Sequence, residues 1–87
     1  MQVTLMVSDW CASCDQAEKV WREVAAERGI DLAVVGLAQP EGRALAARLK
    51  LKTIPAVLVD GSLKAIGVQT RQQALEILDA ADASMDL

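Results

Sequence analysis

Residues 3–14 read Val-Thr-Leu-Met-Val-Ser-Asp-Trp-Cys-Ala-Ser-Cys, and the rest of the predicted architecture follows from them. The segment opens with a short apolar run rich in β-branched residues, which is typical of a buried strand. Cys11 and Cys14 come next, three positions apart, and apolar residues then recur at helical spacing as far as Gly29, a helix stop. The pattern predicts a strand that passes through a loop into a helix, with both cysteines at the helix start.

The remaining chain carries signals for three more strands and two more helices. Asp60-Gly61 is a strong hairpin signal, and Thr70 with Gln73 forms a capping-box pattern before the last helix. The tail, 82–87, is expected to be frayed. The other expected elements are strands at 31–35, 54–59 and 63–68, a helix at 41–49 with Pro40 in its first turn, and a helix after Thr70.

The resulting element order is β-α-β-α-β-β-α, which indicates the α/β class. Strands joined through a helix are expected to run parallel, and the hairpin adds an antiparallel edge. A four-stranded mixed sheet with helices on both faces is the natural packing. The 87 residues fit a single domain that spans 1–87.

Composition narrows the classes of partner and the cellular compartment. The chain has 9 basic and 12 acidic side chains with no dense basic run, so we expect neither nucleic acid nor a membrane as a partner. No apolar stretch is long enough to cross a bilayer. The first residues lack the pattern of a secretory signal, so a cytoplasmic location is expected. We also expect the protein to be a monomer.

Two cysteines and no histidine limit the possible site chemistry. A disulfide scaffold joins distant segments, whereas this pair closes only a very small loop. Nucleophilic catalysis by a Cys–His pair is excluded, and a self-contained structural zinc site needs more cysteines or histidines. Redox chemistry and two-coordinate binding of a soft metal remain.

The position of the cysteines at a strand-to-helix junction favours redox chemistry. Unpaired N–H groups and the helix dipole stabilise a thiolate there, and each unit by which the pKa of a thiol falls corresponds to about 1.36 kcal/mol. Because the thiolate attacks in disulfide exchange, we expect Cys11 to be the nucleophile. Cys14 shares a helix face with the apolar Ala17 and Trp21, so it should be the more buried sulfur and should resolve a mixed disulfide.

Other interpretations of the same pair remain open from the residues alone. The cysteines can be ordinary small core residues in a redox-inactive interaction domain. The alternative function is a soft-metal module, because heavy-metal-associated domains also place Cys-X-X-Cys between a first strand and a first helix and bind Cu(I) through thiolates. Their element order is β-α-β-β-α-β, whereas a helix follows the second strand here. No metal is therefore assigned to Cys11 and Cys14.

A second motif, Thr53-Ile54-Pro55, opens the third expected strand. Together with Trp10-Cys11-X-X-Cys14 it makes the chain resemble the thioredoxin family, and in particular its short glutaredoxin-like, redox-active-disulfide members. The segment Val59-Asp60-Gly61 matches as well. The resemblance covers nearly the whole chain, from Val3 to about Ala81, and implies the thioredoxin-like fold.

The resemblance implies a thiol–disulfide oxidoreductase that reduces disulfides of protein substrates. It carries over Cys11 and Cys14 as catalytic residues and Pro55 as a cis proline that faces them. Ile54 would offer backbone hydrogen bonds to an extended substrate, and Trp10 would contact it. No dissociable cofactor is needed, because the Cys11–Cys14 disulfide carries two electrons, and the electrons would come from a reductase or a small thiol.

Several positions depart from the family pattern or permit two roles. Leu5 stands where typical thioredoxins carry a buried acid, so proton transfer would fall to water or to Asp9 or Asp15. The segment 67–70 lacks the Gly-Gly-acid pattern of glutaredoxins, so glutathione binding is not expected. Trp10 can wall the site or pack into the core, and Ser13 can donate to the Cys11 thiolate or stay a solvated hydroxyl, whereas Trp21 is expected in the core.

Overall fold

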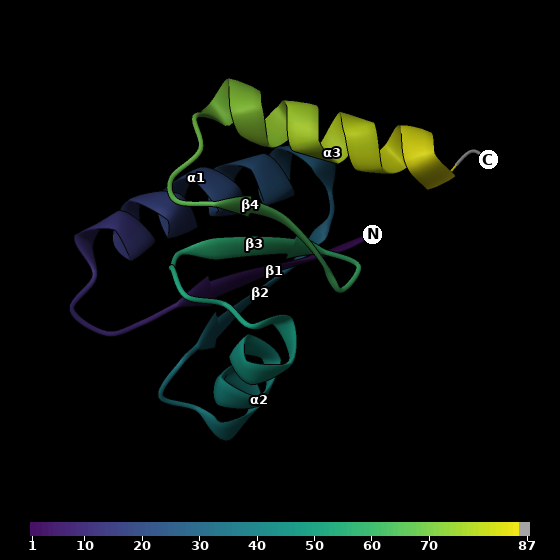
Figure 1. Cartoon of the computed structure of the whole chain (residues 1–87). Coiled ribbons are helices and arrows are strands. Elements are labelled where there is room, and N and C mark those ends of the chain that lie inside the picture. Colours follow the sequence, from purple (N-terminus) through teal and green to yellow (C-terminus); the bar gives the residue numbers. More distant parts are fainter. Residues whose placement is uncertain (86–87) are drawn as a thin grey trace.

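The structure is a computed structural model that describes residues 1–85 of the chain. Four strands form one sheet in the order β2-β1-β3-β4, and three helices cover its two faces (Figure 1). The predicted α/β class, element order and mixed sheet are confirmed. The elements are β1 (Gln2–Val7), α1 (Ala12–Arg28), β2 (Asp31–Gly36), α2 (Pro40–Leu49), β3 (Ala56–Val59), β4 (Ser62–Ile66) and α3 (Arg71–Met85).

Two hydrophobic clusters, one on each face of the sheet, hold the helices in place. Alternate residues of a strand point to opposite faces, so Val3 and Leu5 of β1 pack toward α1 and α3, whereas Met6 packs toward α2. All three side chains are fully buried. Figure 1 shows α1 and α3 on one side of the sheet and α2 on the other. The larger cluster consists of Val3, Leu5, Ala17, Trp21, Val24, Val57, Val59, Ala74, Leu78 and Ala81.

Strand β3 runs in the direction opposite to the one predicted. The sequence predicts parallel strands wherever a helix joins them, yet β3 is antiparallel to β1, with Val3 opposite Val59 and Met6 opposite Ala56. Helix α2 has ten residues and spans only about 15 Å. It runs at a steep angle to the strands, and the segment 50–55 returns the chain to the edge where β1 ends (Figure 1). The prediction of a parallel third strand is therefore wrong.

Several element boundaries also differ from the sequence-based expectation. β3 begins at Ala56, after the predicted start at residue 54, because Pro55 has no N–H to donate to the strand ladder. β4 ends at Ile66, since Gly67 takes the left-handed conformation with φ 87°. Helix α3 continues through 82–85, which the sequence predicts as frayed: alanine favours helix there, and the buried Ala81 anchors that part of α3. Residues 86–87 lie outside the described residues.

Helices α1 and α3 are joined by polar contacts as well as by the core. Arg28 donates to Asp79 at 2.9 Å, which raises the pKa of the Arg28 guanidinium, and Arg71 pairs with Glu27. At the start of α3 the predicted capping box is present, with Thr70 and Gln73 exchanging side-chain and backbone hydrogen bonds. No helix within residues 1–85 is long and apolar enough to cross a membrane.

Trp21 is buried in the core, as predicted, and is held by one specific hydrogen bond. Its indole Nε1 donates to Gln69 Oε1 at 3.1 Å, and Gln69 Nε2 donates to the carbonyl oxygen of Ile66 at 3.3 Å. Gln69 is only 6% exposed, which makes it the buried polar side chain that links the β4–α3 loop to α1. The loop that follows β4 is thereby fixed against the core.

Replacing Trp21 by phenylalanine should lower the free energy of unfolding by about 1–3 kcal/mol, because the buried Gln69 amide oxygen loses its donor. Urea denaturation measures the change. Adding Gln69→Leu to the Trp21→Phe variant should cost less than Gln69→Leu alone. Strictly additive effects of the two substitutions would contradict the importance of this hydrogen bond.

Candidate redox site

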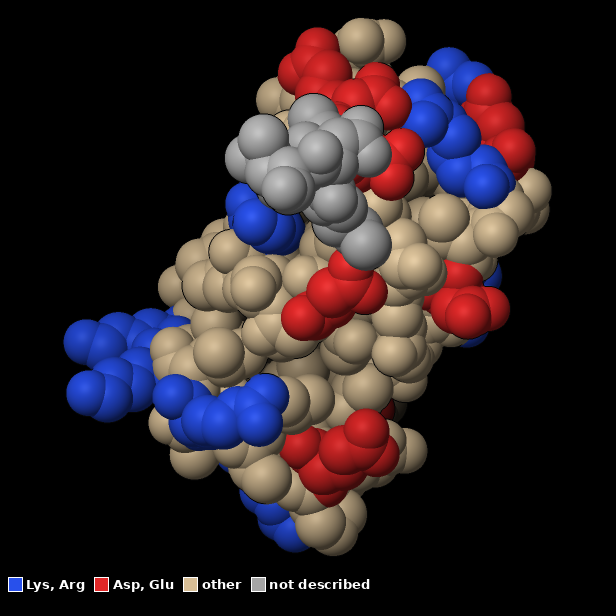
Figure 2. All heavy atoms as spheres, turned by 90° about the vertical axis from the view of Figure 1, so that its right-hand side faces the viewer, with Lys and Arg blue, Asp and Glu red and all other residues tan. Residues whose placement is uncertain are grey.

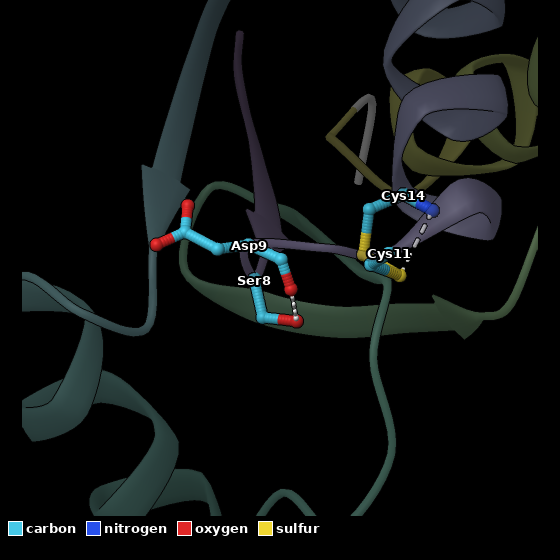
Figure 3. The surroundings of a disulfide bond; sticks show 4 residues. All are labelled: Ser8, Asp9, Cys11 and Cys14. Atoms are coloured by element: carbon cyan, nitrogen blue, oxygen red, sulfur yellow. Dashed lines mark hydrogen bonds between the residues drawn. A yellow bond between two sulfur atoms is a disulfide. The ribbon is translucent and has the colours of Figure 1, made fainter.

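The site starts where β1 ends and α1 begins. The loop 8–10 leads to Cys11, which is the N-cap of α1 with extended backbone angles, φ −121° and ψ 102°. Its Sγ accepts a hydrogen bond from the backbone N–H of Cys14 at 3.1 Å (Figure 3). One of the N–H groups that a helix start leaves unpaired is therefore satisfied by sulfur. The sequence prediction that Cys11 lies at the helix N-terminus is confirmed.

The two cysteines form a disulfide, with their Cα atoms 5.1 Å apart. Cys14 is 2% exposed and lies on the face of α1 that carries Ala17 and Trp21, whereas Cys11 is only half-buried. Figure 3 shows the disulfide at the end of the helix. The pair therefore offers one sulfur to the surface and holds the other beneath it, as the helical spacing predicts.

Trp10 lies entirely in solvent, immediately before Cys11. Its exposed fraction of 103% excludes the core position that the sequence leaves open. Its backbone is in the left-handed region, with φ 59°, which is uncommon for a bulky residue. The loop thus turns the indole outward beside the disulfide instead of folding it onto the sheet.

Pro55 reaches the same edge of the sheet from the other direction. Met6 pairs with Ala56, so Pro55 lies beside the end of β1, from which the loop to Cys11 departs. The Ile54–Pro55 peptide bond is cis. Pro55 is fully buried, Ile54 is half-buried, and the carbonyl oxygen of Pro55 accepts a hydrogen bond from Gly67 N–H at 2.7 Å. This last contact, which ties the segment after β4 to the site, has no signal in the sequence.

The arrangement is a surface-facing disulfide at a helix start beside a cis-proline segment, and the sequence matches the family described as "Thioredoxin domain" over residues 1–79. The chain belongs to the thioredoxin family. It is therefore a thiol–disulfide oxidoreductase with a redox-active Cys-X-X-Cys pair. No curated protein sequence matches it.

Solved thioredoxins share the fold at low sequence identity. Thioredoxin 1 from Thermosipho africanus is 16% identical with a TM-score of 0.74, and the alignment covers 100% of each chain. A chloroplastic thioredoxin z is 17% identical with a TM-score of 0.76, covering 94% of this chain and 78% of the other. Thioredoxin f2 from Chlamydomonas reinhardtii is 18% identical with a TM-score of 0.69, covering 91% and 77%. These likenesses show the fold.

The polar surroundings of the disulfide in this thioredoxin-family chain are sparse. Leu5 is fully buried on β1, and Asp9 and Asp15 are exposed. Figure 3 shows the Asp9 carboxylate directed away from the sulfurs, while Ser8 Oγ donates to the Asp9 carbonyl oxygen at 3.4 Å. Ser13 is exposed and makes no side-chain hydrogen bond within the described residues. Within the described residues, the hydrogen bond at the sulfurs therefore comes from the backbone, from Cys14 N–H to Cys11 Sγ.

Metal-ligating side chains do not gather in the described part of the chain. Across residues 1–85 no group of three or more histidine, cysteine, aspartate or glutamate side chains is placed to hold a metal ion. Cys11 and Cys14 bring two sulfur atoms together, and these are joined to each other in a disulfide.

Proposed function

We propose that this protein reduces disulfides of protein substrates, with Cys11 as the attacking and Cys14 as the resolving cysteine. The observation that carries the proposal is the difference in exposure between the two sulfurs at the start of α1. Cys11 is half-buried and caps the helix, whereas Cys14 is 2% exposed. A large substrate can reach the first sulfur but not the second.

Charge at the start of α1 supports this division of roles. After reduction, the Cys11 sulfur keeps its place at the N-terminus of a 17-residue helix, where backbone N–H groups and the helix dipole favour an anion. The Cys14 N–H that donates to Cys11 Sγ in the disulfide would donate to the thiolate as well. Thiolate is the reactive species in disulfide exchange, so this position favours attack by Cys11.

The reaction proceeds in two exchanges that conserve sulfur–sulfur bonds and electrons. The Cys11 thiolate attacks one sulfur of the substrate disulfide, a mixed disulfide forms, and the departing substrate sulfur takes a proton from water. Cys14 then loses its proton to water and attacks Cys11 Sγ, which releases the second substrate thiol. The substrate gains two electrons, and the protein ends in the Cys11–Cys14 disulfide observed in the structure.

Three further residues are proposed to bind the substrate around the sulfurs. Trp10 offers a fully exposed aromatic surface next to Cys11. Pro55 lies at the same edge of the sheet, and the backbone of Ile54 precedes it without a place in any strand. An extended substrate chain would therefore lie between the indole and the segment 54–55.

The proposed cycle needs no dissociable cofactor, because the disulfide itself carries the electrons. A reductase or a small thiol would supply them, in a monomeric protein that works in the cytoplasm. The face seen in Figure 2 carries separate groups of acidic and basic side chains with uncharged surface between them. That distribution supports the proposal that neither nucleic acid nor a membrane is a partner.

Trapping the mixed disulfide tests the assignment of roles. Reduced Cys14→Ser protein, mixed with insulin in the absence of other thiols, should retain insulin on Cys11 through a mixed disulfide, because no second sulfur releases it. Mass spectrometry of the non-reduced digest locates the linkage. Wild-type protein under the same conditions should reduce insulin and show no lasting adduct.

The reciprocal variant is the control for this experiment. Reduced Cys11→Ser protein should form no adduct, since the remaining Cys14 sulfur is 2% exposed. An adduct on Cys14 that equals the one on Cys11 would show that the roles are not divided as proposed.

A further inference from the structure

A groove lies between strand β4 and helix α3, outside the disulfide site. It has a volume of about 470 Å³ and is formed by the end of β4, the loop that follows and one side of α3. The proposed reaction uses none of it. We call it the β4–α3 groove, and its main lining residues are Ala65, Ile66, Val68, Gln73, Glu76 and Ile77.

Exposed apolar side chains gather at this groove. Ile66 is 49% exposed and Val68 is 41% exposed, and both line the groove. Within residues 1–85, β4 pairs with β3 alone, so its other edge is open to an extended chain. Large apolar side chains beside an open strand edge indicate a surface that an extended peptide segment covers.

The groove is continuous with the place where the substrate is proposed to bind. Gly67, which lies between the lining residues Ile66 and Val68, donates its backbone N–H to the carbonyl oxygen of Pro55 at 2.7 Å. The segment 66–68 therefore borders both Pro55 and the groove.

A carboxylate in the groove lining favours an occupant with a basic side chain at that position. Glu76 is the charged side chain of the groove lining and is exposed; within residues 1–85 it accepts a hydrogen bond only from the uncharged Gln72, at 3.2 Å. The two amides of the lining already have partners: Gln69 binds Trp21, and Gln73 binds the backbone of Thr70. A segment with apolar side chains and one basic side chain fits these surroundings.

We propose that the β4–α3 groove binds an extended apolar segment of the protein substrate that carries a lysine or arginine opposite Glu76. The inference rests on the proposed function, because this segment belongs to the molecule whose disulfide Cys11 attacks. The groove lies away from the sulfurs, so it selects among protein disulfides and leaves the exchange chemistry unchanged.

Two cystine peptides test the proposal. Each carries a Gly-Ser spacer of about six residues, which spans about 20 Å, and then a tail, Leu-Val-Leu-Lys in one and Leu-Val-Leu-Glu in the other. Each peptide is made in two versions, one with the tail on the N-terminal side of the cystine and one with it on the C-terminal side. The second-order rate constant for oxidation of reduced protein should be about twofold to fivefold higher with the lysine tail in one of the two orientations. Glu76→Lys should reverse that preference.

The matched control makes the same charge change elsewhere. Glu23→Lys replaces an exposed carboxylate on α1 and should keep the wild-type preference for the lysine tail. Ile66→Thr keeps a β-branched residue in β4 and should lower the rate constant with either tail by about threefold to tenfold, but not with a peptide that has no tail.

Ellman's reagent, a small aromatic disulfide without a tail, separates disulfide exchange at Cys11 from binding in the β4–α3 groove. Reduced wild-type, Glu76→Lys and Glu23→Lys proteins should react with it at the same rate. A wild-type rate no faster than that of dithiothreitol would contradict the proposed function itself. A fast reaction together with equal rate constants for the two tails in both orientations would overturn the groove proposal alone.

Discussion

Replacing Cys11 with serine should abolish the reduction of protein disulfides while leaving the fold intact. A serine hydroxyl does not ionise near neutral pH, and Cys14, the other of the two cysteines, is only 2% exposed. The initial rate of insulin reduction with dithiothreitol should fall to the uncatalysed background, a loss on the order of 10³-fold or more. The effect is large because, in the proposed mechanism, Cys11 alone attacks the substrate disulfide.

The structure also explains why this variant should stay folded. Cys11 is the N-cap of α1, and serine is among the residues most favoured there, so its Oγ can accept the Cys14 N–H that Sγ accepts now. The lost disulfide spans a sequence separation of only 3 and constrains the unfolded chain little. Circular dichroism and the urea midpoint should be close to those of the reduced wild type.

Ser13→Ala is the matched control at the same helix start. The Ser13 side chain is exposed and makes no hydrogen bond within the described residues, so the activity of this variant should equal that of the wild type. Wild-type turnover by the Cys11→Ser protein would remove Cys11 from the mechanism.

The largest effect on stability is expected at Gly42, in the first half of α2. A Cβ atom built there overlaps the carbonyl oxygen of Gly36 and lies 2.8 Å from its carbonyl carbon and 3.2 Å from Val35 Cγ1. Backbone atoms cannot turn aside as a side chain can. Alanine gains about 1 kcal/mol over glycine in helix propensity, but α2 would have to lift off β2. We expect Gly42→Ala to lower the free energy of unfolding by about 2–3 kcal/mol, measured by urea denaturation.

Gly36 offers the control from the other side of the same contact. A Cβ atom on Gly36 meets nothing within 4 Å, and its φ is outside the left-handed region, so Gly36→Ala should change stability by less than about 0.5 kcal/mol. If Gly42→Ala proved as stable as the wild type, the close approach of α2 to β2 would be wrong.

Local signals in the sequence predict most of the site. The strand, loop and helix around Cys11 follow from residue types at adjacent positions, and the greater burial of Cys14 follows from helical spacing. The capping box at Thr70 and the helix stop at Gly29 likewise involve neighbours in the chain. Such features are predictable because each depends on a few residues close in sequence.

Features that depend on contacts between residues far apart in the chain could not be predicted from local sequence patterns. The direction of β3 depends on the end of the sheet to which the segment 50–55 returns the chain, and no residue pattern predicts which end that is. In the sequence, Gly42 is simply a residue of low helix propensity. Its close approach to Gly36 is evident only in the folded chain. The hydrogen bond between Trp21 and Gln69 joins residues 48 positions apart. In each case packing, and not local propensity, determines the outcome.

The two tryptophans give the molecule two separate optical signals. The chain has no tyrosine or phenylalanine, so its near-ultraviolet emission comes from Trp10 and Trp21 alone. Trp21 sits in an apolar interior and should emit at shorter wavelength, lost when the chain unfolds. Trp10 emits from water next to a sulfur pair that quenches an excited indole, so its intensity should rise on reduction. One spectrum can therefore follow both the oxidation state and the integrity of the core, without an added dye.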